Sequence, residues 1–238
     1  MIIDAHATVG RNRDVELDAE TLLRRMDELR IDLALVSPPE SSVAVSNREG
    51  NDLVAAAAAQ SGGRLRPYAV ASPWLGASAL SELDRARSLG AVALKLDPAL
   101  QGFDLLDGLV DPLLEYAAAA DWPVYVRTGT PPHALPLQLA VVAQRHQGVS
   151  FILGKSGATD FSADGPLALA EAPNLYADSA HVEWPTRFAH VQPNRVVLTT
   201  DVPFTDGAVE LARVTESGLP DDACAQVLGE TMARLLHL

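Results

Sequence analysis

The feature that most constrains the fold is an alternation, repeated about eight times, of short β-branched runs with longer Ala/Leu-rich amphipathic segments. This alternation is typical of βα units, which build a parallel sheet with helical connections. The strands predicted in this way are 2–6, 33–36, 67–71, 91–96, 123–127, 149–154, 174–177 and 195–200. The helices predicted between and after them are 22–29, 51–60, 77–88, 105–120, 135–146, 167–172, 207–217 and 221–235.

The later strands indicate how the sheet is covered. Segments 91–96, 123–127 and 149–154 are apolar at nearly every position, as expected when helices cover one face and a barrel interior covers the other. We therefore predict a closed (β/α)8 TIM barrel. A chain of 238 residues with 48% apolar content can bury such a core, so we expect a single domain over residues 1–238. In the first strand, Asp4 and His6 are predicted to share one face at a period of two.

Charge and composition limit the partners. A net charge of -13 argues against nucleic acid or an anionic membrane as a general partner. The single cysteine, Cys224, excludes an internal disulfide and suits a reducing compartment. There is no leader segment and no apolar run of the roughly 20 residues that span a bilayer. We expect a cytoplasmic protein and, since the barrel is near the lower size limit for its fold, a homodimer.

Polar residues at the predicted carboxyl ends of the strands are the candidate site, because chemistry in such barrels lies where strands end and loops begin. The candidates are His6, Thr8, Lys95, Asp97, Arg127, Lys155, Ser156, Asp178, His181 and Asp201.

Several of these strand ends together resemble the amidohydrolase-2 branch of the metal-dependent hydrolase superfamily, whose members include decarboxylases and hydrolases. The segments that carry the resemblance are Ile3-Asp-Ala-His6, Ala93-Leu-Lys-Leu-Asp-Pro98 with Gln101-Gly-Phe103, Pro123-Val-Tyr-Val-Arg-Thr-Gly129, Phe151-Ile-Leu-Gly-Lys-Ser-Gly157, Asn174-Leu-Tyr-Ala-Asp178 and Leu198-Thr-Thr-Asp-Val-Pro203. The set covers nearly the whole chain, and its order is more specific than any one segment.

The resemblance also implies where a metal ion would bind, and here the chain departs from the family. The implied metal positions fall on His6, Thr8, Arg127, Lys155 and Asp201, so two of the five keep a ligand side chain, and Asp97 stands where the family commonly has a His. Arg and protonated Lys offer no lone pair to a cation, and zinc needs at least three protein ligands. We therefore expect neither a metal nor an organic cofactor. The alternative is a displaced metal site built from His6, Asp201, Asp97 and His181.

Fixed positive charge is predicted to replace the ion. Arg127 and Lys155 with Asp201 leave a net charge near +1, as a divalent ion with one carboxylate would. Such a pair of cations could bind an anionic substrate or stabilise an oxyanion. Asp201 or His6 would then remove the proton from water directly. The competing interpretation is that Arg127 and Lys155 form structural pairs with Asp97 and Asp201, which would neutralise the pocket. Lys155 with a lowered pKa could also act as a Schiff-base amine.

Other residues are assigned smaller roles. Lys95 either contacts substrate or pairs with Asp97 or Asp178 as scaffolding. Thr8 opens space for substrate, and the loop residues His181 and His133 are candidates for substrate contact. The aromatic residues that follow strand ends are candidates for an apolar wall: Trp74, Phe103, Trp184 and Phe204.

Three functions follow from this set of residues. The first is metal-independent hydrolysis of a lactone, amide or ester of a small anionic molecule. In that reaction His6 and Asp201 are the acid and base, and Arg127 and Lys155 bind the anion. The second is a lyase, a decarboxylase or dehydratase, in which the same cations stabilise a carbanion or enolate. The third is a barrel that binds a ligand without turnover.

Overall fold

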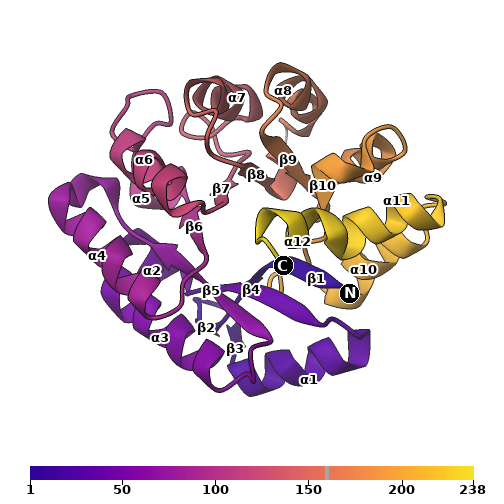
Figure 1. Ribbon diagram of the computed structural model, residues 1–238, viewed down its shortest axis with the longest axis horizontal. Coiled ribbons are helices and arrows are strands. Elements are labelled where there is room, and N and C mark those ends of the chain that lie inside the picture. The colour runs from indigo at the N-terminus through magenta and orange to yellow at the C-terminus, as the bar shows by residue number, and fades with distance from the viewer. Residues whose placement is uncertain (159–160) are drawn as a thin grey trace.

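The computed structural model describes residues 1–158 and 161–238, and it contains an eight-stranded parallel barrel. The sheet runs in the order β1-β4-β5-β6-β7-β8-β9-β10, with every neighbouring pair parallel. Figure 1 shows these strands at the centre of a ring of helices. The predicted (β/α)8 fold is confirmed. The barrel strands are β1 (Ile3–Thr8), β4 (Leu33–Ser37), β5 (Leu65–Val70), β6 (Ala93–Leu96), β7 (Val124–Arg127), β8 (Phe151–Gly154), β9 (Leu175–Asp178) and β10 (Val196–Val197).

The last strand is shorter than predicted. Regular pairing with β9 covers only β10, after which the chain runs beside β1. There the Ala5 N–H donates to the Leu198 carbonyl at 2.8 Å, and the Asp201 N–H donates to the His6 carbonyl at 3.0 Å. These bonds bring the chain beyond β10 next to the first strand, so Asp201 lies against His6.

A helix is found at each predicted position, but α5 (Pro98–Gln101) and α9 (Trp184–Ala189) were not predicted and one predicted helix starts late. The predicted helix 105–120 begins only at Asp111, because the Asp104 and Asp107 carboxylates accept the N–H groups of Leu106 and Leu109 and hold those residues in turns. The helices are α1 (Ala19–Leu29), α2 (Glu40–Ala44), α3 (Asn47–Ala59), α4 (Ala77–Ser88), α5 (Pro98–Gln101), α6 (Asp111–Ala120), α7 (Pro136–Arg145), α8 (Gly165–Glu171), α9 (Trp184–Ala189), α10 (Gly207–Thr215), α11 (Asp221–Ala225) and α12 (Thr231–Leu235).

Short elements at the carboxyl ends of the strands were not predicted. A hairpin of β2 (Gly10–Arg11) and β3 (Glu16–Leu17) follows β1, and α2 follows β4. Helix α2 places Glu40 next to the barrel mouth, because it begins directly beyond Pro38 and Pro39. Such elements are too short to give a periodic signal.

Two apolar layers hold the barrel together. Outside the strands, residues such as Leu94, Leu153 and Val36 pack against the surrounding helices. Inside, Ile3, Ala5, Leu35 and their neighbours pack against Met232 and Leu235 of α12. Helix α12 therefore closes the amino end of the barrel, and it lies across the centre of the view in Figure 1. Only the carboxyl end is left for a site.

A β-bulge in β1 overturns the prediction that Asp4 and His6 share a face. The register with β4 shifts between Asp4 and Ala7, so the two-residue alternation is broken. His6 then points into the barrel, where its ring stacks on Tyr125. Asp4 points outward and accepts hydrogen bonds from the backbone N–H and hydroxyl of Thr200.

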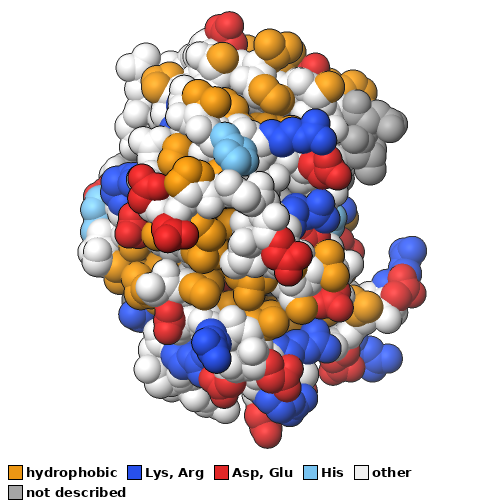
Figure 2. All heavy atoms as spheres, turned by 90° about the vertical axis from the view of Figure 1, so that its right-hand side faces the viewer, with side chains coloured by type: hydrophobic (Ala, Val, Ile, Leu, Met, Phe, Trp, Pro, Cys, Tyr) orange, Lys and Arg blue, Asp and Glu red, His pale blue; other side chains and the backbone are white. Residues whose placement is uncertain are grey.

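The outer surface carries mixed charge. Figure 2 shows acidic and basic side chains interspersed with apolar ones on the side of the barrel near α9, α10 and α11. In the described part of the chain, no helix combines the length and the hydropathy required to cross a bilayer. Cytoplasmic location and the homodimer stay predictions.

Candidate functional site

A shallow cavity, about 260 Å³ including open space, lies at the carboxyl ends of the strands. Sequence analysis did not predict two of its residues, Glu40 and Tyr125. The signals for them are their positions: Glu40 lies three residues after the end of β4, and Tyr125 lies two residues before Arg127 on the same face of β7. The cavity is lined by His6, Glu40, Lys95, Asp97, Tyr125, Arg127, Lys155, Asp201 and Phe204.

Asp201 is the centre of the polar network. Its Oδ1 accepts from His6 Nδ1 at 2.9 Å, and its Oδ2 contacts His181 Nε2 at 2.7 Å and Lys155 Nζ at 3.1 Å. Burial alone would raise its pKa, but the hydrogen bonds from the two His residues and the charge of Lys155 lower the pKa well below its usual value. Asp201 is therefore a fully engaged carboxylate with little tendency to accept a proton.

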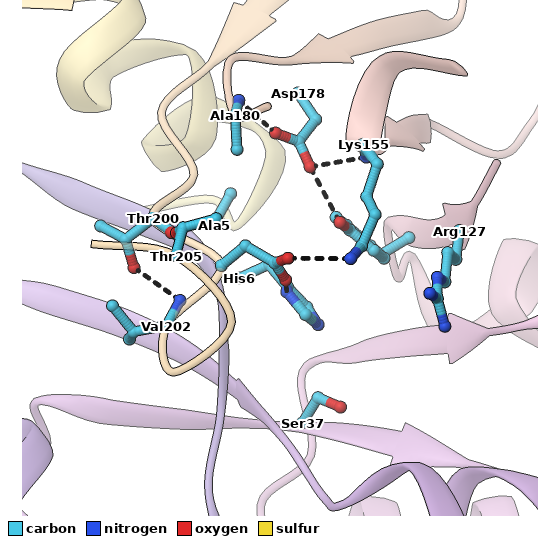
Figure 3. A network of polar contacts seen from close by, with 12 residues as sticks. Ala5, His6, Ser37, Arg127, Lys155, Asp178, Ala180, Thr200, Val202 and Thr205 are labelled. Atoms are coloured by element: carbon cyan, nitrogen blue, oxygen red, sulfur yellow. Dashed lines mark hydrogen bonds and ion pairs between the residues drawn. The ribbon is translucent and has the colours of Figure 1, made fainter. Parts of the chain in front are cut away.

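Three members of this network have left-handed backbone conformations. Lys155, His181 and Asp201 have φ angles of 60°, 70° and 49°. Each such residue without glycine's freedom costs on the order of 1–2 kcal/mol. All three lie just beyond β8, β9 and β10, and their side chains meet at the barrel mouth. Figure 3 shows the Lys155 amine reaching from its loop to a carboxylate that lies beside His6. Strain retained at three neighbouring strand ends indicates a functional site.

The hydrogen bonds of His6 fix its tautomer. A carboxylate oxygen only accepts, so Nδ1 must carry the proton that it donates to Asp201. In the neutral ring, Nε2 is then an acceptor, and it faces Lys95 Nζ at 2.8 Å. Burial is the largest reason why the pKa of His6 is lowered to about 4, and the nearby charge of Lys95 lowers it further. His6 is thus neutral at pH 7, oriented on one side by a carboxylate and on the other by an amine.

The sequence left two roles open for Lys95, and the structure does not show the pairing with Asp97 or Asp178. Its Nζ contacts His6 Nε2 and donates to Ser37 Oγ at 2.9 Å, and it forms no salt bridge with any described residue. The side chain is buried, with the residue 6% exposed. Burial lowers its pKa to about 8, although the negative charges of Asp97 and Asp201 act to raise it. Asp201, His6 and Lys95 therefore form a line of hydrogen bonds that ends at the cavity.

Arg127 keeps free hydrogen-bond donors. Its Nη1 donates to Asp97 Oδ2 at 3.1 Å and to Glu40 Oε1 at 3.2 Å. Burial would lower the pKa of Arg127, but the two carboxylates raise it overall. Both contacts found in the described part of the chain use Nη1, so Nε and Nη2 keep their N–H groups for a ligand. These two atoms form the side of the guanidinium that binds a carboxylate bidentately.

The cations and carboxylates that line the cavity are equal in number. The cavity is lined by three cationic groups, Lys95, Lys155 and Arg127, and by three carboxylates, those of Glu40, Asp97 and Asp201; when all are ionised, 3 − 3 = 0. The net charge near +1 that the sequence predicts counts Arg127, Lys155 and Asp201 alone, and the other charged groups of the lining bring the total to zero. Lys155 pairs with Asp201 and Arg127 pairs with Asp97, as in the competing interpretation. Unused N–H groups, rather than net charge, are what the site offers to an anion.

The distribution of lysine is a further signal. The chain has 18 basic residues, and all except Lys95 and Lys155 are arginines. Both lysines line the cavity. An Arg side chain is not deprotonated in proteins, whereas an amine can lose a proton and act as a base or nucleophile. The two amine side chains of the chain are thus placed where this property could be used.

Tyr125 packs against the hydrogen-bonded network. Its ring stacks on His6 with centroids 4.3 Å apart and an interplanar angle of 10°. Its hydroxyl donates to Asp178 Oδ2 at 2.8 Å, and Asp178 also accepts the Lys155 N–H at 2.9 Å. Burial raises the pKa of Asp178 to about 6. Asp178, a candidate from the sequence, therefore positions Tyr125 and the loop that carries Lys155 instead of lining the cavity.

Gly154→Ala is expected to displace Tyr125. A Cβ at this position would lie 2.4 Å from Tyr125 Cε1, so the ring must leave its present position against His6. We expect the free energy of unfolding to fall by about 1–3 kcal/mol, the usual cost of overpacking. Urea unfolding tests this, with Gly148→Ala as control, because its Cβ would meet Ala118 Cβ only at 3.9 Å. Equal stability of the two variants would show that the stack is not rigid.

Several predicted contacts are not brought to the cavity. Phe103 is 1% exposed in the apolar core, and Trp74 is 61% exposed, with its indole N–H donating to the Gln101 carbonyl. Their assignment to an apolar wall is corrected: Phe204 lines the cavity instead, with Lys155 Nζ 5.5 Å from its ring centroid. Residues that lie elsewhere are Thr8, buried with no hydroxyl partner in the described part of the chain, Ser156, whose hydroxyl donates to the Asp178 carbonyl, and His133 and Trp184 in neighbouring loops.

The residues present do not suit a divalent metal ion. The lone pair of His6 Nε2 faces an amine, and Lys155 Nζ occupies the space beside Asp201 Oδ2. Zinc would need at least three ligands at about 2.0–2.3 Å, and its charge would oppose both lysines. Among the described residues, no group of three or more His, Cys, Asp or Glu side chains is arranged to hold a metal ion. The donor chemistry of the site therefore disagrees with the metal that the resemblance implies.

The family model described as amidohydrolase matches residues 3–238. The chain belongs to the amidohydrolase family. A search of curated proteins gave no match.

Solved structures of several enzymes have the same fold as this chain. A 2,6-dihydroxybenzoate decarboxylase in complex with 2,6-dihydroxybenzoate is 17% identical with a TM-score of 0.75, and each chain is covered completely. The 5-carboxyvanillate decarboxylase of Sphingomonas paucimobilis is 16% identical with a TM-score of 0.74, covering 100% of this chain and 98% of that chain. The 4-oxalomesaconate hydratase of Rhodopseudomonas palustris is 13% identical with a TM-score of 0.73, covering 100% and 96%. At these identities the likeness shows the fold.

A larger hollow, about 950 Å³ including open space, lies on the outer side between α1 and the start of α10. Asp4 lines it, and burial raises the pKa of this carboxyl to about 7. Thr200 and the His6 backbone N–H already donate to Asp4. Carboxylates and one arginine line this hollow, but neither lysine does, so we assign the chemistry to the smaller cavity.

Proposed function

We propose that this amidohydrolase is a metal-independent lyase that removes CO2 or water from a small carboxylated substrate. The observation that carries the proposal is the line Asp201–His6–Lys95, with an amine at the cavity wall and two further cations beside it. A carboxylate of the substrate would bind the free N–H groups of Arg127 and Lys155. Negative charge that develops on an enolate or carbanion would be stabilised by the same cations.

Hydrolysis, the first prediction from the sequence, is less well supported by this geometry. It required Asp201 or His6 to remove a proton from water, but Asp201 already accepts from three side chains, and the free nitrogen of His6 faces Lys95. Lys95 is the better proton carrier, because its pKa of about 8 lies near neutral pH. The names of the neighbouring decarboxylases and hydratase agree with elimination chemistry.

Chelator-treated protein is expected to keep its activity. A panel of hydroxybenzoates and oxo acids would be incubated with protein purified in EDTA, with products followed by NMR in ¹⁸O-labelled water. We expect product formation that zinc or manganese does not increase. Activity that appears only after metal is added would overturn the metal-independent mechanism. Incorporation of solvent oxygen into a new carboxylate would favour hydrolysis, and ligand-induced stabilisation without turnover would indicate a binding protein.

A further inference from the structure

Lys95 lies in the geometry of an activated nucleophile. Covalent catalysis by a side chain requires a proton acceptor within hydrogen-bond distance, held in turn by a third group. His6 Nε2 lies 2.8 Å from Lys95 Nζ, and Asp201 Oδ1 lies 2.9 Å from His6 Nδ1. Ser37 Oγ, 2.9 Å from the amine, holds it from the other side. The arrangement supplies nucleophile, proton acceptor and orienting carboxylate in one line.

The other cations define what could reach this amine. Lys155 and the free side of Arg127 line the same cavity as Lys95. A ligand with a carboxylate on these donors would present the neighbouring part of its skeleton to Lys95. An amine forms a covalent bond most readily with a carbonyl carbon. The ligand class that satisfies both groups is a small oxo acid.

Extending the proposed function, we propose that Lys95 forms an imine with the carbonyl carbon of a small 3-oxo carboxylic acid whose carboxylate is bound by Lys155 and Arg127. The Lys95 nitrogen forms a bond to the carbonyl carbon while His6 Nε2 accepts a proton from nitrogen and returns it to the oxygen. A second proton releases this oxygen as water and leaves a positively charged iminium.

The iminium then accepts the electron pair of the bond that breaks. Cleavage of the carbon–carboxylate bond releases CO2 and leaves an enamine on Lys95. A proton adds to the enamine carbon, and water restores the carbonyl and frees the amine. The water consumed balances the water released, so the net reaction is 3-oxo acid anion plus one proton giving ketone plus CO2. No metal, oxidant or reductant is required.

The lysine content makes the test specific. The protein would be incubated with acetoacetate, or with acetone as a neutral control, and reduced with borohydride, followed by peptide mapping by mass spectrometry. The competing amines are Lys155 and the N-terminus. We expect an isopropyl adduct on Lys95 that forms roughly 100-fold faster than on either competitor, the size of effect that a positioned base supplies. No adduct on Lys95, or an adduct mainly on a competing amine, overturns the proposal.

A variant separates carboxylate binding from imine formation. Arg127→Gln is expected still to form the acetone-derived adduct on Lys95. Its preference for acetoacetate over acetone is expected to be about tenfold lower, since one charge-assisted contact contributes about 1.5 kcal/mol or more. An unchanged preference would overturn the assigned carboxylate position. If other carboxylates are turned over in a reaction that requires Lys95, but borohydride traps no adduct, the imine proposal is overturned and the proposed lyase function stands. If an adduct is trapped on Lys95 but no acid is turned over, the imine proposal is supported and the proposed lyase function is overturned.

Discussion

Lys95→Met is expected to lower turnover by roughly 10³-fold, the range attributed to a positioned acid or base, and to make the protein more stable at pH 7. In the folded state the pKa of Lys95 is about 8, below its ordinary value of 10.5. Below pH 8 the amine is protonated in both states, and burying this charge costs about 3 kcal/mol. In the variant, His6 Nε2 loses its hydrogen bond from Lys95, and this loss offsets part of the gain in stability. We expect a net increase of about 1–2 kcal/mol.

The sign of this effect depends on pH. Between pH 8 and 10.5 the unfolded chain binds a proton at Lys95 that the folded chain does not, so wild-type stability rises with pH in this window. The advantage of Lys95→Met is therefore expected to shrink above pH 8 and disappear near pH 10. Urea unfolding at pH 7 and 10 measures this. A lower stability of the variant at pH 7 would show that the buried charge of Lys95 does not destabilise the folded protein.

Lys155→Met is the matched control, because the chain has two lysines and both line the cavity. Lys155 Nζ is paired with Asp201 at 3.1 Å, and its side chain is 18% exposed. Its removal takes one partner from a buried carboxylate, so we expect stability to fall by about 1–3 kcal/mol. Opposite signs for the same substitution would demonstrate that one lysine serves the structure and the other is kept at a cost in stability.

Asp201→Asn is expected to have the largest effect on stability. The carboxylate contacts His6, His181 and Lys155, and replacing it leaves buried donors without an anionic partner. We expect the free energy of unfolding at pH 7 to fall by about 3–5 kcal/mol and turnover to fall by roughly 10²-fold or more, because His6 loses the group that sets its tautomer. Circular dichroism during urea unfolding and product assays provide the two measurements.

The pH dependence identifies this carboxylate as the cause. The pKa of Asp201 is well below its usual value in the folded state, so its contribution is complete above about pH 4 and is lost as pH falls further. The difference between wild type and Asp201→Asn should therefore be constant above about pH 4 and decrease as the pH falls below 4. Asp14→Asn, at an exposed position, is the control and is expected to stay within about 0.5 kcal/mol of wild type at each pH. A pH-independent difference would contradict the assigned charge.

Local patterns predicted the site residues better than their roles. The positions of His6, Arg127 and Asp201 at strand ends placed them at the barrel mouth, because parallel strands bring their carboxyl ends to one edge. The pairing of Lys95 could not be predicted, since its partners come from β1 and β4, far apart in the chain. Tyr125 was read only as part of a strand, although its ring supports His6.

By itself, the sequence determined the barrel and the polar residues at the ends of its strands, because apolar periodicity and side-chain chemistry are local properties. Only the tertiary structure decided that Asp4 faces outward, since one bulge reverses the alternation within β1. It also decided which cations are neutralised. Lys155 and Arg127 meet carboxylates from other strands, while Lys95 is held by uncharged partners, because hydrogen-bond partners in a closed barrel are set by strand register and loop conformation.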